Sequence, residues 1–145
     1  MKKKGIIVSG YFNPIHKGHI EYFKLAKKRG NYLIVIVNND FQRKLKKSKE
    51  FMMEEERFLI VKELKIVDKV ILSIDKDKSV SKTLEKISLD LSEEYDLYFA
   101  NGGDQNIKSI PETKICNKRD IKMLFGLGEK IQSSSWLLKK WYDNK

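Results

Sequence analysis

His16 and His19 are the only two histidines of the chain, and they lie three positions apart. They follow an apolar run, residues 5–9, that predicts a buried strand, and they precede residues 20–28, where apolar side chains recur at helical spacing. The two histidines therefore share one face of a helix start, where free backbone N–H groups and the positive helix end attract anions. Gly18 leaves room for a ligand to approach the backbone. This pattern predicts a phosphate site with two imidazole donors that take on charge near neutral pH.

The segment from Gly10 to His19 resembles the HxGH signature of the nucleotidyltransferase superfamily, which includes glycerol-3-phosphate cytidylyltransferase and pantetheine-phosphate adenylyltransferase. The matching positions are Gly10, Phe12, Asn13, Pro14, His16, Gly18 and His19. Asn13 replaces the commoner aspartate of the family, which exchanges a charge for an amide. The resemblance implies that His16 and His19 are catalytic. It also implies that four neighbours contact the nucleotide, namely Tyr11, Phe12, Asn13 and Gly18.

A basic segment, residues 41–49, follows the apolar run 32–37 and is expected to be an irregular loop. Counted from His19, Lys46 falls where glycerol-3-phosphate cytidylyltransferase carries its catalytic lysine, so the resemblance implies that it neutralises transition-state charge. Three neighbouring lysines leave the register open: Lys44, Lys47 and Lys49. The alternative for these three and Lys46 is that they are solvated cations of a loop. Arg57 falls at a family arginine position, which implies substrate binding. The alternative for Arg57 is a surface arginine paired with a nearby glutamate.

A polar turn, residues 101–104, follows the apolar run 97–100. It resembles the family's glycine–aspartate turn near the nucleotide. Gly103 would permit close backbone approach, and Asp104 would bind a ribose hydroxyl or a magnesium ion through water. The alternative is a plain turn, for which this composition is common.

A hydroxyl-rich segment near the end of the chain resembles the family's ISSS or ISTT signature, which binds the β- and γ-phosphates at the start of the last helix. Its members are Gln132, Ser133, Ser134 and Ser135. Hydroxyls and free N–H groups converge on an anion at such a helix start, although a single serine suffices for a simple N-cap. Lys130 lies near the position where the cytidylyltransferase form has an arginine, and we expect it to supply that charge.

Apolar runs alternate with amphipathic segments along the chain, which predicts an α/β fold with a parallel sheet. We expect one domain spanning residues 1–145, a Rossmann-like three-layer sandwich with a five-stranded, mainly parallel sheet. The expected strands are residues 6–9, 32–37, 67–74, 97–100 and 121–125, with a further short strand near 114–116. The expected helices are residues 18–29, 52–64 and 80–91 and a last one that begins at Ser133. Every polar segment named above follows a strand, so they meet at one edge of the sheet.

The composition limits the class of protein further. A single cysteine, Cys116, excludes an internal disulfide and favours a cytoplasmic location, and no apolar run reaches membrane-spanning length or forms a signal peptide. The net charge of +10 leaves open an alternative of another class, a basic nucleic-acid-binding module. Lysines interleaved with acidic residues along the whole chain are more typical of solvated helix faces, so nucleic acid is an unlikely partner.

We therefore expect a nucleotidyltransferase that joins a nucleoside triphosphate to a phosphorylated small molecule and releases pyrophosphate. Chain length and the position of Lys46 favour transfer of CMP from CTP. The alternative is an adenylyltransferase that uses ATP on a sugar phosphate or a phosphopantetheine-type acceptor. Mg²⁺ is expected to enter with the triphosphate, and no side chain is identified as a metal ligand. A zinc site at the two histidines lacks nearby ligands to complete a tetrahedral set. The resemblance also implies a homodimer.

Overall fold

The computed structural model describes residues 2–47, 49–101 and 110–127. Within them the strands form one sheet of order β3-β2-β1-β4-β5, in which every neighbouring pair is parallel. The strands are β1 (Lys3–Gly10), β2 (Tyr32–Val37), β3 (Lys69–Leu72), β4 (Tyr95–Ala100) and β5 (Lys122–Leu124). The helices are α1 (Lys17–Lys28), α2 (Asp40–Leu45), α3 (Glu54–Lys62), α4 (Ser81–Leu91) and α5 (Thr113–Lys118). The expected α/β fold is confirmed, and this sheet is wholly parallel.

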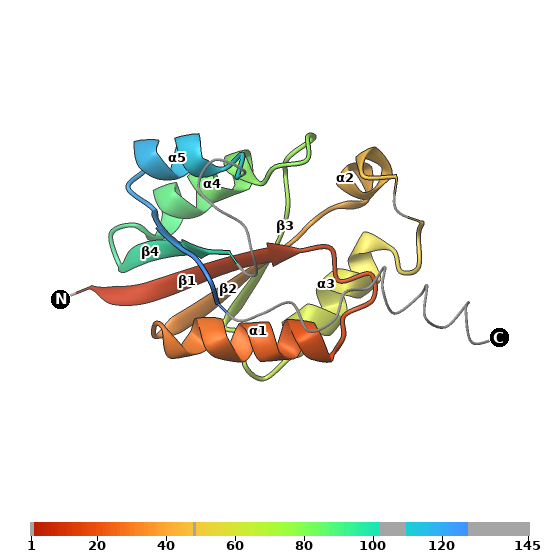
Figure 1. The fold of residues 1–145 in the computed structure, drawn as a ribbon, viewed down its shortest axis with the longest axis horizontal. Coiled ribbons are helices and arrows are strands. Elements are labelled where there is room, and N and C mark those ends of the chain that lie inside the picture. The colour runs from red at the N-terminus through yellow and green to blue at the C-terminus, as the bar shows by residue number, and fades with distance from the viewer. Residues whose placement is uncertain (1, 48, 102–109, 128–145) are drawn as a thin grey trace.

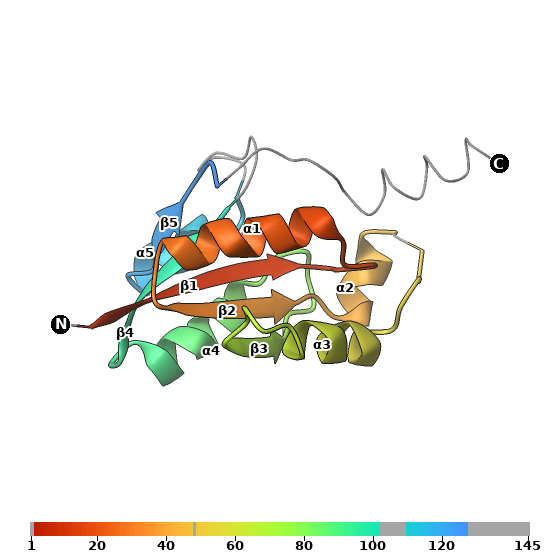
Figure 2. The same ribbon diagram turned by 90° about the horizontal axis from the view of Figure 1, so that it is seen from below.

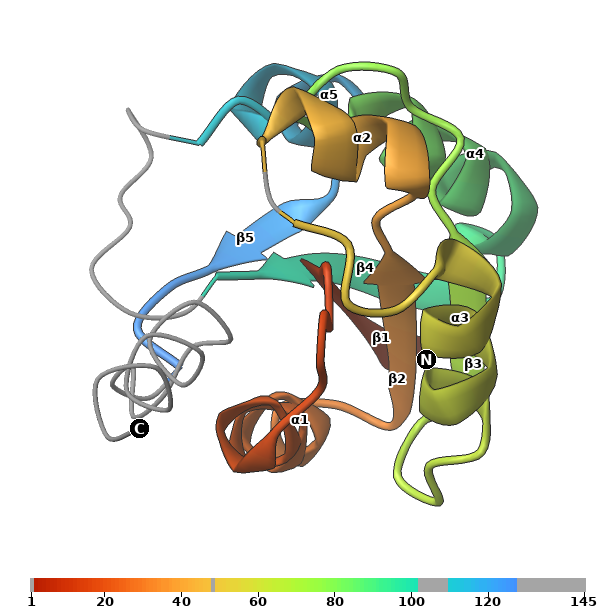
Figure 3. The same cartoon turned by 90° about the vertical axis from the view of Figure 1, so that its right-hand side faces the viewer.

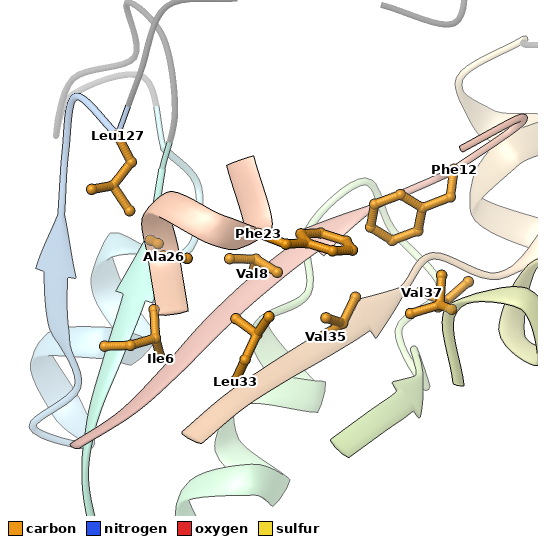
Figure 4. Close-up of a cluster of buried hydrophobic side chains, with 11 residues drawn as sticks. Ile6, Val8, Phe12, Phe23, Ala26, Leu33, Val35, Val37 and Leu127 are labelled. Atoms are coloured by element: carbon orange, nitrogen blue, oxygen red, sulfur yellow. The ribbon is translucent and has the colours of Figure 1, made fainter. Parts of the chain in front are cut away.

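Helices cover both faces of the sheet and make three layers, as Figure 1 and Figure 2 show. Because side chains alternate along a strand, Ile6 and Val8 of β1 face α1, whereas Ile7 faces α4. On the first face, Phe23 of α1 packs over the sheet (Figure 4). On the second face, Leu84 of α4 occupies the equivalent position. Each of these five side chains is fully buried, so burial on both faces fixes the sheet between its helices.

The strand order reverses next to β1, because the chain passes from β1 through α1 to β2 on one side, while β4 pairs on the other side. In open parallel sheets, ligands bind beyond the carboxyl ends of the strands at this switch point. Figure 3 looks onto that edge, with α2 above the end of β1 and α1 below it. The turn that carries His16 and His19 lies at this edge.

Gly10 ends β1 and leaves space for the aromatic ring of Phe12. A Cβ atom at residue 10 would lie 2.8 Å from two carbons of the Phe12 ring, closer than real side chains approach one another. Phe12 adopts φ 53°, which turns its ring back toward the sheet, where it is 2% exposed. The glycine expected from the family signature therefore has a packing reason in this structure.

Two segments differ from the sequence-based expectation. Residues 41–49 were expected to be irregular, but α2 begins at Asp40 because Asn39 and Gln42 form a reciprocal capping box. A short strand was expected at residues 114–116, whereas the structure has α5, one helical segment that buries Cys116 against α4. None of the helices in the described part of the chain is long and apolar enough to cross a membrane.

Candidate active site

The two histidines cap α1 through their ring nitrogens. His16 is the N-cap residue, and its Nδ1 accepts a hydrogen bond of 3.0 Å from the backbone N–H of Gly18. Nδ1 of His19 accepts a hydrogen bond of 3.1 Å from the backbone N–H of His16. The two rings stack with centroids 3.9 Å apart and an interplanar angle of 27°. Because both Nδ1 atoms are acceptors, each neutral ring carries its proton on Nε2.

Both imidazoles favour the neutral form in this arrangement. Burial lowers the pKa of His16, and burial together with the charge of His16 lowers the pKa of His19 to about 3. Nε2 of His16 is buried without a hydrogen-bond partner among the described residues. A buried N–H group without an acceptor costs free energy, so a ligand oxygen that accepts a hydrogen bond from this atom would be stabilised here. The histidines are thus preformed neutral donors, rather than the groups charged near neutral pH that we expected.

The lowered pKa of His19 predicts a pH-dependent stability. Between the unfolded value of 6.5 and the folded value of about 3, the unfolded chain binds more protons than the folded chain. The free energy of unfolding should therefore rise with pH across this window, by up to about 1.4 kcal/mol per pH unit from this group. As the pH falls through this window, the folded protein loses the stability that depends on an uncharged His19.

The variant His19→Asn isolates this contribution, because the Asn oxygen lies as many bonds from Cα as Nδ1 and does not titrate. Urea unfolding from pH 4 to pH 8 measures the stability difference between wild type and variant. We expect that difference to change with pH below 6.5 and to stay constant above it. A difference that is independent of pH throughout would mean that His19 titrates normally in the folded protein.

Phe12 and Asn13 support the histidine turn from inside the protein. The Phe12 ring packs edge-on against His19, with centroids 4.9 Å apart, and against Phe23 at 5.6 Å. Asn13 is 5% exposed, and its Nδ2 donates a hydrogen bond of 2.8 Å to the carbonyl of Lys49. Its Oδ1 accepts from the backbone N–H groups of Phe51 and Met52 at 3.1 and 2.8 Å. These contacts give both side chains a supporting role in the turn. The nucleotide contact that the resemblance implied for them stays a prediction.

Lys46 lies at the C-cap of α2, not in an irregular loop. Its Nζ lies 4.6 Å from the ring centroid of Tyr11, in the turn that leads to the histidines. The structure thus brings an exposed cation from a separate part of the chain to the first turn, and its catalytic role stays a prediction. Tyr11 itself is half-buried, and burial raises the pKa of its phenol, although the Arg57 charge opposes this.

Arg57 is fully buried, which differs from both the substrate-binding and the surface position considered above. Its Nη1 donates to the carbonyls of Tyr11 and Asn38 at 2.7 and 2.6 Å. Its Nε donates to the carbonyl of Met52 at 3.1 Å, and Nη2 donates to Oδ1 of Asp40 at 2.8 Å. The guanidinium therefore joins the ends of β1 and β2 to α2 and to the segment before α3.

The carboxylate of Asp40 is the anionic partner of this buried cation. Burial alone would raise the pKa of Asp40, but the backbone N–H of Glu54 and the Arg57 guanidinium outweigh it and hold the pKa below its usual value. Asp40 therefore stays ionised at neutral pH, and the pair keeps α2 fixed against α3.

A cavity of about 280 Å³ lies at the carboxyl edge of the sheet, on the side of α4 and α5. It is lined by Ser9, Gly10, Tyr11, Asn38, Lys78, Val80, Phe99, Asn101, Pro111 and Glu112. Burial raises the pKa of Glu112, although its Oε2 accepts a hydrogen bond of 2.9 Å from the backbone N–H of Val80. Lys78 and Glu112 were not singled out from the sequence, because neither belongs to a motif.

Several expected site residues lie outside the described residues, and their proposed roles stay predictions. They are Gly103, Asp104, Lys130, Gln132, Ser133, Ser134 and Ser135. Across residues 2–47, 49–101 and 110–127, no three side chains of His, Cys, Asp or Glu come close enough together to hold a metal ion.

The fold and the capped histidine pair are those of a nucleotidyltransferase. The model of the cytidylyltransferase-like family matches residues 7–142, and the chain belongs to this family. A FAD synthase from Ferroglobus placidus is 40% identical over 119 residues, which cover 82% of this chain and 72% of the relative. A FAD synthase from Picrophilus torridus is 35% identical and covers 90% of both chains.

Two further similarities agree with this assignment. The bifunctional protein HldE of Blochmanniella floridana is 37% identical over 74% of this chain, although the match spans only 21% of that longer protein. The crystal structure of a lipopolysaccharide core biosynthesis protein from Thermoplasma volcanium superposes with a TM-score of 0.67 at 26% identity. That similarity covers 85% of this chain and 95% of the other.

Proposed function

We propose that this nucleotidyltransferase is an adenylyltransferase that joins ATP to FMN, forming FAD and pyrophosphate. The FAD synthases among its relatives support this choice, because two of them match at 40% and 35% identity over most of the chain. We therefore favour ATP over CTP as the nucleotide substrate, whereas the sequence analysis favoured CTP. CTP stays the second candidate, because Lys46, counted from His19, falls where glycerol-3-phosphate cytidylyltransferase carries its catalytic lysine.

The preformed neutral donor on His16 is the observation that carries the proposal. Its orphaned Nε2–H lies at the N-terminus of α1, where the helix also favours a negative charge. A phosphate oxygen of the triphosphate satisfies this donor, and Nε2 of His19 lies on the stacked neighbouring ring. Donors that are fixed before the reaction stabilise developing charge without reorganisation.

The reaction requires no nucleophilic side chain. A phosphate oxygen of the acceptor attacks the α-phosphorus of the triphosphate, a new P–O bond forms, and the bond to the bridging oxygen of the β-phosphate breaks. Pyrophosphate leaves with that electron pair. The acceptor oxygen is already anionic, so the protein's task is to position the groups and to neutralise charge. His16, His19 and Lys46 perform this task in our proposal.

We infer that the acceptor occupies the cavity at the carboxyl edge. The cavity begins at Gly10 and Tyr11, in the same turn that leads to the histidines. Mg²⁺ would enter as a complex with the triphosphate, whose phosphate oxygens are ligands that it prefers. The homodimer implied by the resemblance stays a proposal.

A pyrophosphate-release screen tests this function. ATP and CTP are each combined with FMN, 4′-phosphopantetheine, a sugar phosphate and glycerol 3-phosphate, and the product is identified by mass. We expect release with ATP and FMN and the appearance of FAD. Release of pyrophosphate only with CTP would overturn the choice of base. If no acceptor supports release with either nucleotide, the proposed enzymatic activity is wrong. A salt-sensitive affinity for RNA that does not need the histidines would favour the nucleic-acid alternative.

A further inference from the structure

Glu112 is a buried acidic residue that no step of the proposed reaction uses. It is 8% exposed and directly precedes α5, and burial raises the pKa of its carboxyl group. Two backbone N–H groups donate to the carboxylate, that of Val80 at 2.9 Å from Oε2 and its own. A carboxylate has about four acceptor positions, so these two N–H groups leave capacity for a further donor. The buried acid therefore favours a ligand that donates hydrogen bonds.

The carboxylate of Glu112 lies where it can meet a ligand in the cavity at the carboxyl edge. Glu112, Val80 and Tyr11 all line this cavity of about 280 Å³. The hydrogen bond from Val80 places Oε2 at the backbone of one lining residue. Burial raises the pKa of the Tyr11 phenol, and the charge of Glu112 adds to this effect, so the two groups lie near one another. The acid is thus within reach of two segments that border the cavity, the N-cap of α4 and the turn after β1.

The negative charge of Glu112 also decides which end of an acceptor can lie beside it. A phosphate group would be repelled by this carboxylate in a partly enclosed cavity. The reacting phosphate belongs near the N-terminus of α1, where His16 offers its Nε2–H donor. The groups next to Glu112 are then uncharged and belong to the carbon chain that follows the phosphate. In a phosphorylated polyol these groups are hydroxyls, each of which can donate a hydrogen bond.

We propose that Glu112 is a specificity-determining residue whose carboxylate accepts hydrogen bonds from the hydroxyls of a polyol phosphate, here the ribityl chain of FMN. This inference rests on the proposed function, because it concerns the acceptor of the same reaction. The hydroxyls supply the donors that the two backbone N–H groups leave lacking, and hydrogen bonds to a charged acceptor are the stronger kind. An acceptor with a hydroxyl-free chain would leave the buried charge without these donors and would bind more weakly.

Equilibrium binding of FMN without ATP tests this role, with flavin fluorescence as the readout. Glu112→Gln keeps an oxygen for the N–H of Val80 but removes the charge, and it should raise the Kd for FMN by about tenfold. A flavin analogue with hydrogen in place of each ribityl hydroxyl should bind wild type about tenfold more weakly than FMN does. Glu112→Gln should not weaken the binding of this analogue, because the hydrogen bonds in question are already absent.

Glu93→Gln is the matched control, because Glu93 is exposed and lies just before β4, at the opposite edge of the sheet. It should leave the Kd for FMN unchanged, and urea unfolding checks the fold of each variant. The comparison of the two ligands on wild type does not depend on any variant being folded.

Three results would overturn the role of Glu112. These are a wild type that does not bind FMN, equal binding of FMN and the analogue by wild type, and an effect of Glu112→Gln that is the same for both ligands. Binding that shows the expected differences, without pyrophosphate release from ATP and FMN, would refute the proposed function and keep this inference.

Discussion

His16→Asn should lower turnover by about 10²–10³-fold while leaving the fold stable. The Asn oxygen lies as many bonds from Cα as Nδ1 of histidine, and asparagine is a favoured N-cap residue, so the hydrogen bond from Gly18 is kept. The variant loses the ring stacked on His19 and, with it, the Nε2–H donor, which has no partner in the described structure and which we assign to the phosphates. Pyrophosphate release at saturating substrate measures the loss, and urea unfolding checks the fold.

His16→Gln is the complementary variant. Its amide nitrogen lies as many bonds from Cα as Nε2, so it restores a donor near the site, but it lacks the Nδ1 acceptor that caps α1. We expect it to lose about 1 kcal/mol of stability and to retain more turnover than His16→Asn. Near-normal turnover in His16→Asn would show that the donor does not take part in the reaction.

Arg57→Met should destabilise the protein by about 3–5 kcal/mol. The substitution leaves the ionised Asp40 without its buried cation and removes hydrogen bonds from the carbonyls of Tyr11, Asn38 and Met52. Urea unfolding at pH 7 measures the change. A stable variant would mean that the buried pair contributes little to holding α2 in place.

Two further variants control this result. Arg29→Met replaces an exposed arginine at the end of α1 and should change stability by less than about 0.5 kcal/mol. Adding Asp40→Asn to Arg57→Met removes the unpaired charge and should recover part of the lost stability, since the two residues act as a pair.

The fold and the first turn could be predicted because their signals are local. The alternation of apolar runs and helical spacing defines β1, α1 and β2 within neighbouring residues, and His16 and His19 lie within one helical turn. These features depend on the sequence near each residue, so the sequence alone is sufficient to find them. The role of Lys46 was instead inferred by counting residues along a family resemblance, and it stays a prediction.

The rest depends on contacts between distant residues. Arg57 finds its acceptor at Tyr11, 46 positions away, and Asn13 finds Met52, 39 positions away, so their burial is not visible in their own segments. The lowered pKa values of the histidines arise from desolvation by the packed turn. The cavity arises only where β1 and β4 meet the loops before α4 and α5. The helix α5 buries Cys116 against α4, a contact that its own segment does not reveal.

A crystal structure of the protein with α,β-methylene ATP tests the central claim most directly, because this analogue binds as ATP does but cannot release its pyrophosphate. We expect phosphate oxygens within hydrogen-bonding distance of Nε2 of His16 and Nε2 of His19, with Nζ of Lys46 facing the same phosphates. A triphosphate bound away from the N-terminus of α1, with both Nε2 atoms still unpaired, would contradict the account.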